Sequence, residues 1–190
     1  MSPRTNQQNE VLRQQKREQI MSAALELFAV EGFHSTSISD IAEKARISKG
    51  LMYNYFKSKD ELLASIMETG FDKLLEGFDP NHDGVLTRDE LILYLREILK
   101  MIMGDPYYWK LYYSIFLNPA TNSEILMKIM EKSESFFKIL AEYFERKGSK
   151  SSFAEARLFV AMFDGFCLNA LYDEEFPINE SIQIIIDKFV

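Results

Sequence analysis

Apolar residues recur at three- and four-residue spacing along almost the whole chain of 190 residues, and no sustained alternation of apolar and polar positions appears. The first spacing places apolar side chains on one face of an α-helix, whereas strict alternation is typical of a strand. Proline and glycine fall mostly between the periodic stretches, where they mark helix ends. The pattern therefore predicts an all-α protein, with helices at residues 13–31, 38–45, 48–54, 59–77, 87–103, 105–117, 122–147, 152–172 and 179–190.

The N-terminal stretch, residues 1–12, is polar and typical of a flexible arm, which in some DNA-binding proteins becomes ordered on the duplex. The chain contains no run of eighteen apolar residues, and its polar N-terminus does not resemble a signal peptide. We therefore expect a soluble cytoplasmic protein without a membrane partner.

The formal net charge of −7 argues at first against a nucleic-acid partner, because phosphate binding requires a positive surface. The charge is unevenly distributed, however. Residues 1–60 hold 9 Lys+Arg against 7 Asp+Glu, whereas residues 61–190 hold 13 against 22. This distribution predicts a basic N-terminal part that can approach DNA and an acidic remainder that does not.

Residues 36–63, TSISDIAEKARISKGLMYNYFKSKDELL, have the pattern of a helix-turn-helix. Ser37 or Ser39 can cap a short first helix, and Ser48 can cap the second. Small and apolar residues are expected to pack the two helices together: Ile38, Ile41, Ala42, Ala45, Ile47 and Leu51. The second helix is then left with outward residues Lys49, Gly50, Tyr53 and Asn54. A helix held in this way can enter a major groove, which is about 12 Å wide.

The stretch IMSAALELFAVEGFHSTSISDIAEKARISKGLMYNYFKSKDELL, within residues 16–63, resembles the DNA-binding domain of the TetR family of transcriptional regulators. The matching positions are Gly32, Phe33, Thr36, Asp40, Ile41, Ala42, Ala45, Ser48, Lys49, Gly50, Tyr53, Tyr55, Phe56, Lys59, Asp60, Glu61 and Leu62. The resemblance covers about a quarter of the chain. It implies a three-helix, helix-turn-helix DNA-binding domain at residues 13–58 and a helical effector-binding and dimerisation domain at residues 59–190.

The resemblance also implies which residues lie at or near DNA. Lys49 can meet a phosphate or a guanine edge, Asn54 can pair with adenine or bind phosphate, and Gly50 lets the helix backbone come close to the duplex. The implied contact residues are Thr36, Ser37, Ser48, Lys49, Gly50, Leu51, Tyr53, Asn54, Tyr55 and Lys59. The chain departs from the family pattern at Arg46, where glycine is usual, and at Asn54, where histidine is frequent.

Residues 79–90, DPNHDGVLTRDE, match every position of the calcium-loop pattern D-x-[DN]-x-[DN]-G-x5-E. The spacing can wrap the chain around an ion that needs about six or seven oxygen ligands. The candidate ligands are Asp79, Asn81, Asp83, the Val85 carbonyl, Thr87 and Glu90. The same residue types are equally typical of turns, and Thr87-x-x-Glu90 is also a capping box. No cofactor is required by the sequence, and calcium is the one candidate; bound there, it would stiffen the joint between the regulatory and DNA-binding parts.

Large apolar and aromatic residues are concentrated at residues 101–116, 135–140 and 159–172. Core packing explains such stripes, but their number also favours an internal pocket for a small apolar or aromatic effector. The candidate pocket residues are Met103, Trp109, Tyr112, Tyr113, Phe116, Phe137, Met162, Phe163 and Phe166.

The last two helices, predicted at residues 152–172 and 179–190, resemble the dimer-forming pair of the family. They carry apolar residues that one chain is not expected to cover alone: Phe159, Phe163, Phe166, Leu171, Ile182, Ile185, Ile186 and Phe189. A symmetric homodimer places two recognition helices about one helical turn of DNA apart, which predicts a palindromic operator.

No catalytic arrangement can be assembled around the two histidines, His34 and His82, so we expect no enzyme. The sequence predicts a ligand-responsive transcriptional regulator, most simply a repressor that binds a double-stranded DNA operator as a homodimer and is released by a small-molecule effector. A calcium-binding module of the EF-hand type, or a calcium-modulated regulator, is the alternative.

Overall fold

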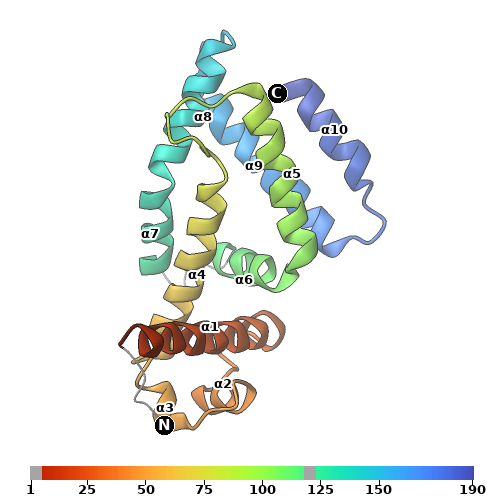
Figure 1. Ribbon diagram of the computed structural model, residues 1–190. Helices are drawn as coiled ribbons and strands as arrows, with labels where there is room; N and C mark the ends of the chain where they lie inside the picture. The colour runs from red at the N-terminus through yellow and green to blue at the C-terminus, as the bar shows by residue number, and fades with distance from the viewer. Residues whose placement is uncertain (1–5, 118–122) are drawn as a thin grey trace. The chain divides into compact units, whose positions relative to one another are not determined.

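A computed structural model describes residues 6–117 and 123–190, and the regular structure within these ranges is entirely helical (Figure 1). The helices are α1 (Asn6–Glu31), α2 (Ile38–Lys44), α3 (Lys49–Met52), α4 (Lys59–Glu76), α5 (Arg88–Gly104), α6 (Pro106–Phe116), α7 (Ser123–Lys132), α8 (Glu134–Arg146), α9 (Ser152–Tyr172) and α10 (Ile178–Phe189). The all-α prediction is confirmed. None of the helices in the described ranges is both long and apolar enough to cross a membrane.

Two predicted elements differ from the structure. The first helix begins at Asn6, so the part of the expected arm that follows Thr5 is helical. The helix predicted at residues 122–147 is two helices, α7 and α8, separated at Ser133. The Ser133 hydroxyl donates a hydrogen bond to the Met130 carbonyl at 2.8 Å, and such back-bonding bends helices. Residue 122 lies outside the described residues.

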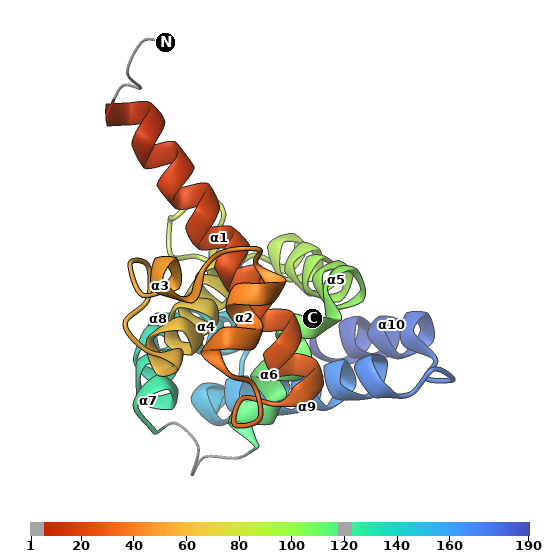
Figure 2. The same ribbon diagram turned by 90° about the horizontal axis from the view of Figure 1, so that it is seen from below.

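The first compact unit, Met1–Thr69, contains α1 to α3 and the first half of α4 (Figure 2). Its core joins side chains of all four helices and the Phe56 ring: Ile20, Ala24, Phe28, Ile41, Ala42, Met52, Phe56, Leu62 and Leu63. The guanidinium of Arg17 on α1 donates to the Ser65 hydroxyl on α4 at 2.9 Å. Because the first half of α4 packs here, the unit extends to Thr69 rather than ending at residue 58 as predicted.

The second compact unit, Gly70–Val190, is built around α9. This helix contacts α5, α6, α8 and α10, and its contact with α8 is the most extensive in the unit. The amphipathic helices α5, α8 and α10 turn their apolar faces inward. The helix α9 is apolar on most of its surface, and these three helices place their apolar faces against it. For this reason α9 lies at the centre of the unit.

Candidate functional sites: a nucleic-acid interface and an apolar cavity

A sharp turn connects α2 to α3 and fixes their mutual orientation. Ile47 donates its N–H to the Ala42 carbonyl at 2.9 Å, and Arg46 donates to Glu43 at 2.9 Å, which together form a Schellman-type helix end. This motif places Arg46 in the left-handed region, with φ of 51°. Glycine is favoured there because it lacks the Cβ that strains other residues. The departure from the family pattern at Arg46 therefore preserves the turn at a conformational cost.

Serine side chains cap the N-termini of both helices of the pair. Ser37 and Asp40 form a capping box at the start of α2, with the Ser37 N–H donating to the Asp40 carboxylate at 2.7 Å. The hydrogen bonds from Ser37 lower the pKa of the Asp40 carboxyl. At the start of α3, the Ser48 hydroxyl accepts the Leu51 N–H at 3.1 Å. The capping that the sequence predicted for Ser37 and Ser48 is confirmed, and both residues are exposed.

The outward face of α3 and the residues after it carry four exposed positions: Lys49, Gly50, Tyr53 and Asn54. Tyr53 exposes 49% of its surface although it is large and aromatic. A Cβ added at Gly50 would meet no atom within 4 Å. Neither the packing nor the backbone of this chain therefore requires glycine at position 50, which leaves close approach by a partner as a reason for it.

Two residues expected at this surface, Thr36 and Lys59, make internal hydrogen bonds instead. Thr36 is buried, and its hydroxyl donates to the Gly32 carbonyl at 2.9 Å, so it is not presented to a partner. The Lys59 ammonium donates to the Phe33 carbonyl at 2.6 Å and the Thr36 carbonyl at 2.9 Å, and thereby holds the loop that precedes α2. The side chains of Thr36 and Lys59 thus hydrogen-bond within the chain, and their contacts with phosphate stay predictions.

Leu51 and Tyr55 complete the comparison with the predicted surface. Leu51 was expected to fill the space between the helices, but it is 37% exposed, and the neighbouring Met52 is the buried residue. A four-residue α3 places Met52 toward the core and leaves Leu51 beside the outward positions. Tyr55 is half-buried.

Among the described residues, no ion pair involves Arg46, Lys49 or Lys57, so three cations near this surface are available to an anionic partner.

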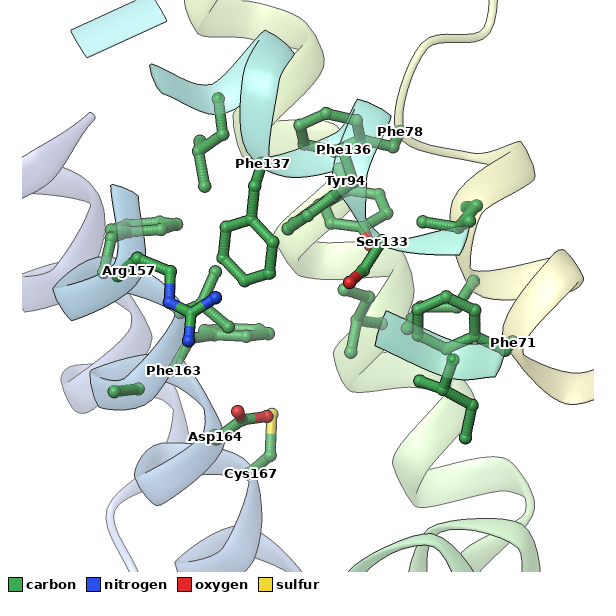
Figure 3. Close-up of a pocket in the computed structure, with 18 of the residues that line it drawn as sticks. Phe71, Phe78, Tyr94, Ser133, Phe136, Phe137, Arg157, Phe163, Asp164 and Cys167 are labelled. Carbon is green, nitrogen blue, oxygen red and sulfur yellow. The ribbon is translucent and has the colours of Figure 1, made fainter. Parts of the chain in front are cut away.

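A cavity of about 530 Å³ lies inside the second unit (Figure 3). Helices α4 to α9 all contribute to its wall. The lining residues are largely apolar and aromatic and include Phe71, Phe78, Leu91, Tyr94, Ile98, Trp109, Tyr112, Phe116, Phe136, Phe137, Phe163 and Cys167. Its volume and lining are those of a typical small-molecule pocket.

Five of the nine predicted pocket residues line this cavity: Trp109, Tyr112, Phe116, Phe137 and Phe163. The other four do not. Met103 is 59% exposed on α5, and Met162 lies on α9 away from the cavity wall. Tyr113 and Phe166 are buried in the core. The centre of the Phe166 ring lies 5.6 Å from the centres of both the Phe163 and the Phe176 rings.

Sequence reasoning missed the contribution of α4 to the cavity. Phe71, Leu74 and Leu75 line it from this helix, and Phe78 lines it from the turn that follows α4. Their spacing of three and four residues was visible in the sequence, but it is equally typical of ordinary core packing. The polar lining residues were also missed, because nothing in the sequence near Arg157 or Asp164 marks them.

Polar groups are few in the cavity and come mainly from α9. The Asp164 carboxylate and the Cys167 sulfur lie side by side in Figure 3. Burial raises the pKa of Asp164 to about 6, opposed by the Tyr113 hydroxyl at 3.4 Å, and burial also raises the pKa of the Cys167 thiol. The Arg157 guanidinium lies 4.8 Å from the centre of the Phe137 ring. The cavity thus offers a large apolar surface with two carboxyl groups, Asp164 and Glu134, and one guanidinium, that of Arg157.

The dimer-forming face predicted on the last two helices is partly wrong. Phe159, Phe163 and Phe166 on α9 and Ile182, Ile185 and Ile186 on α10 are all buried within the single chain. The large apolar residues of these helices that remain exposed are different: Phe153 at 59%, Leu158 at 71%, Tyr172 at 60% and Ile184 at 52%. Periodicity alone could not separate the face that packs internally from the face left outside.

The loop between α4 and α5 brings several of the predicted calcium ligands together. The Asn81 amide donates to the carboxylates of Asp83 and Glu90, at 3.1 and 3.3 Å. Thr87 and Glu90 form the predicted capping box, and Val85 is 46% exposed. Within residues 6–117 and 123–190, no group of three His, Cys, Asp or Glu residues is close enough to hold a metal on its own.

Comparison with known proteins identifies relatives of both units. The sequence model for "Bacterial regulatory proteins, tetR family" matches residues 20–66. YfiR, an uncharacterized HTH-type transcriptional regulator of Bacillus subtilis, is 30% identical over 193 residues, which cover 92% of this chain and 88% of YfiR. IcaR, the negative regulator of the biofilm operon icaADBC in Staphylococcus epidermidis, is 27% identical over 130 residues, 68% of this chain and 69% of IcaR.

Other similarities are shorter or structural. YuxN, another uncharacterized HTH-type regulator of Bacillus subtilis, is 46% identical over 59 residues, which make up 31% of this chain but only 20% of YuxN. The solved structure of the transcriptional regulator FadR from Bacillus subtilis, in complex with stearoyl-CoA, superposes with a TM-score of 0.72. It shares 20% sequence identity, and the superposition covers 91% of this chain and 97% of FadR.

Proposed function

This chain belongs to the TetR family of bacterial regulatory proteins, and from that membership we propose that it binds a palindromic operator as a dimer and is released by a small apolar effector. DNA binding and transcription regulation follow from the family. Repression is the simplest form, since IcaR is a negative regulator.

The exposed end of the helix-turn-helix carries the DNA-binding proposal. Lys49, Tyr53 and Asn54 are exposed side chains that can donate hydrogen bonds, and Lys49 adds a charge without an internal partner among the described residues. Gly50 stands among them with no neighbour within 4 Å. Such a surface suits a helix inserted in a major groove, where a bare backbone allows close approach and the flanking side chains reach base edges and phosphates.

Ser37, Ser48 and Tyr55 suit a supporting role at the phosphates. Ser37 and Ser48 are exposed N-cap residues, and they lie next to the first backbone N–H groups of their helices, which have no partner within the helix. These N–H groups favour an anion such as a phosphate oxygen. Arg46 lies two residues before Ser48, and Lys57 lies two residues after Tyr55. Both carry the positive charge that phosphate contact requires. We therefore add Arg46, which was not among the predicted contact residues.

The apolar cavity supports an effector with a sizeable aliphatic or aromatic body. Its volume of about 530 Å³ leaves room for such a molecule, and only a few polar groups line the wall. FadR, which shares the fold, was solved with stearoyl-CoA, so a long acyl chain is a suitable first probe. Arg157 could then face an anionic group on the ligand, because it has no ion pair among the described residues.

A shift between two populations would connect the effector to DNA. One form has paired recognition helices at the groove spacing and the other does not, and the effector favours the second form by as much as it binds that form more tightly. The helix α4 is a suitable connection, because it begins in the first unit and supplies Phe71 and Leu75 to the cavity. Any effector that binds both forms equally would leave DNA binding unchanged.

The DNA-binding proposal is tested by selecting bound fragments from genomic DNA and measuring their affinity at several salt concentrations. Lys49→Ala should weaken binding and reduce the salt slope by about 0.9 if Lys49 contacts one phosphate. Lys188→Ala, an exposed lysine on α10, is the matched control and should bind as the parent does. Unchanged affinity and slope in Lys49→Ala would remove Lys49 from the interface.

The effector proposal needs a separate measurement. Stearoyl-CoA is titrated into the protein, and binding is followed by the fluorescence of Trp109, which is the single tryptophan and lines the cavity. Release of the operator by the same titration supports the proposal. Binding without release, or release that survives substitution of Phe163 by Trp inside the cavity, would contradict it.

A further inference from the structure

The loop between α4 and α5 has features that operator binding and effector release do not use. It follows Glu76, the last residue of α4, and ends at the N-terminus of α5. Its twelve residues, 79–90, place oxygen-bearing side chains at positions one, three, five, nine and twelve and a glycine at position six. This spacing is specific, because it alternates ligands with spacers around a single turn.

The loop is folded around its first and sixth positions. The Gly84 N–H donates to the Oδ2 atom of Asp79 at 3.0 Å, and Gly84 has φ of 73°, which a residue with a Cβ rarely adopts. Leu86, at the eighth position, is 2% exposed and anchors the loop to the core. The chain therefore turns back on itself at the point where a cation would be enclosed.

Two carboxylates converge on a single amide. The Asn81 Nδ2 group lies 3.1 Å from the Oδ2 atom of Asp83 and 3.3 Å from the Oε1 atom of Glu90. An amide NH2 is the positive end of a dipole, so it partly offsets the repulsion between these two anions. A cation at the same place would offset that repulsion far better, since it carries full charges of opposite sign.

The first ligand position provides an independent observation. The Oδ1 atom of Asp79 is shielded from solvent and has no hydrogen-bond partner. A buried carboxylate oxygen without a partner is costly, because its lost hydration is not replaced. Such atoms in a native fold call for an explanation, and a bound ion is one. Here the unpartnered oxygen belongs to the residue that begins the calcium-loop pattern.

We infer that residues 79–90 bind one calcium ion. Its ligands are the side chains of Asp79, Asn81, Asp83 and Glu90, the Val85 carbonyl, and Thr87 directly or through water. The three acidic residues alone do not form a metal-binding group, and the site depends on the amide and carbonyl oxygens that calcium accepts. A small ion that demands strict octahedral geometry, such as magnesium, suits this irregular set less well. The inference does not depend on the proposed effector or operator.

Calorimetric titration of calcium chloride into the chelator-treated full chain tests the inference. A single loop with three carboxylates is expected to bind one ion with a Kd on the order of 10⁻⁵ to 10⁻³ M. At a calcium concentration about 100 times the Kd, the Tm should rise by roughly 5–10 °C. Absence of both heat and a Tm shift overturns the inference, as does equally tight binding of magnesium.

Two variants separate the loop from nonspecific acidity. Glu90→Gln should weaken calcium binding by more than about tenfold, since even the loss of an outer-shell partner commonly costs that much. Glutamine can still serve in the capping box with Thr87, so the start of α5 is preserved. Asp89→Asn removes the same charge from the adjacent exposed position and should bind as the parent does. Equal loss in both variants, or in neither, overturns the assignment.

Discussion

Replacing Asp164 by asparagine should stabilise the protein at neutral pH and not at acidic pH. Asp164 lies in the cavity wall on α9, where burial raises the pKa of its carboxyl from 3.8 to about 6. Asparagine has nearly the same shape, and its carbonyl can still accept the hydrogen bond from Tyr113. The substitution therefore removes the buried charge and little else.

The magnitude follows from the pKa shift. Each pKa unit corresponds to about 1.4 kcal/mol, so a shift from 3.8 to about 6 gives an upper bound of ~3 kcal/mol. Asp164 is half-buried, and residual solvation reduces this to about 1–2 kcal/mol. The folded state binds the proton more tightly than the unfolded state. The cost is thus absent below pH 3.8, grows as pH rises toward 6, and is complete above it.

Urea denaturation of the parent and of Asp164→Asn at pH 5 and pH 8 measures the difference. The free energy of unfolding of the variant should exceed that of the parent by about 1–2 kcal/mol at pH 8 and by less at pH 5. Glu174→Gln, at an exposed position shortly after α9, is the control and should change stability little at either pH. Equal effects of Asp164→Asn at both pH values would refute the reasoning, because the buried charge would then not be its cause.

Three further predictions concern a turn, a packing contact and the dimer. Arg46→Gly should raise the free energy of unfolding by about 0.5–1 kcal/mol in urea titrations, since glycine adopts the left-handed conformation without strain. The same change should weaken DNA binding. A lower free energy of unfolding would contradict the strain at Arg46. Gly70→Ala should lower the free energy of unfolding by about 1–3 kcal/mol, because the new Cβ would overlap the Tyr108 ring, and an unchanged Tm would show that the ring moves freely. Leu158→Asp should convert a dimer to a monomer in light scattering, and a persisting dimer would exclude this exposed face of α9.

The helix-turn-helix could be predicted from sequence because its determinants are local. Ser48 caps the helix that follows it, and the spacing of Ile41, Ala42 and Ala45 defines one inward face, so each role is readable within a single turn. The position of Lys59 could not be predicted in this way. Its ammonium binds carbonyl groups more than twenty residues earlier in the chain, a contact that only the folded unit creates.

The cavity shows a second limit of sequence reasoning. Aromatic residues such as Trp109 and Phe137 were expected near an effector, and they do line the cavity. Phe166 belongs to the same sequence pattern, but its ring packs against Phe163 and Phe176 and does not line the cavity. The apolar face of a helix indicates which residues point inward. Whether a cavity remains between such faces depends on how all the helices pack together.

The account depends most on α3 entering a DNA groove with its backbone exposed at Gly50. Leucine at this position should leave the Tm unchanged or raise it, because a Cβ here meets no atom within 4 Å and leucine favours a helix more than glycine does. Operator affinity, measured by fluorescence anisotropy on a selected fragment, should nevertheless fall by about tenfold or more, since the side chain blocks close approach and the loss of one good base contact costs that much. A folded Gly50→Leu variant that binds the fragment as tightly as the parent would contradict the account.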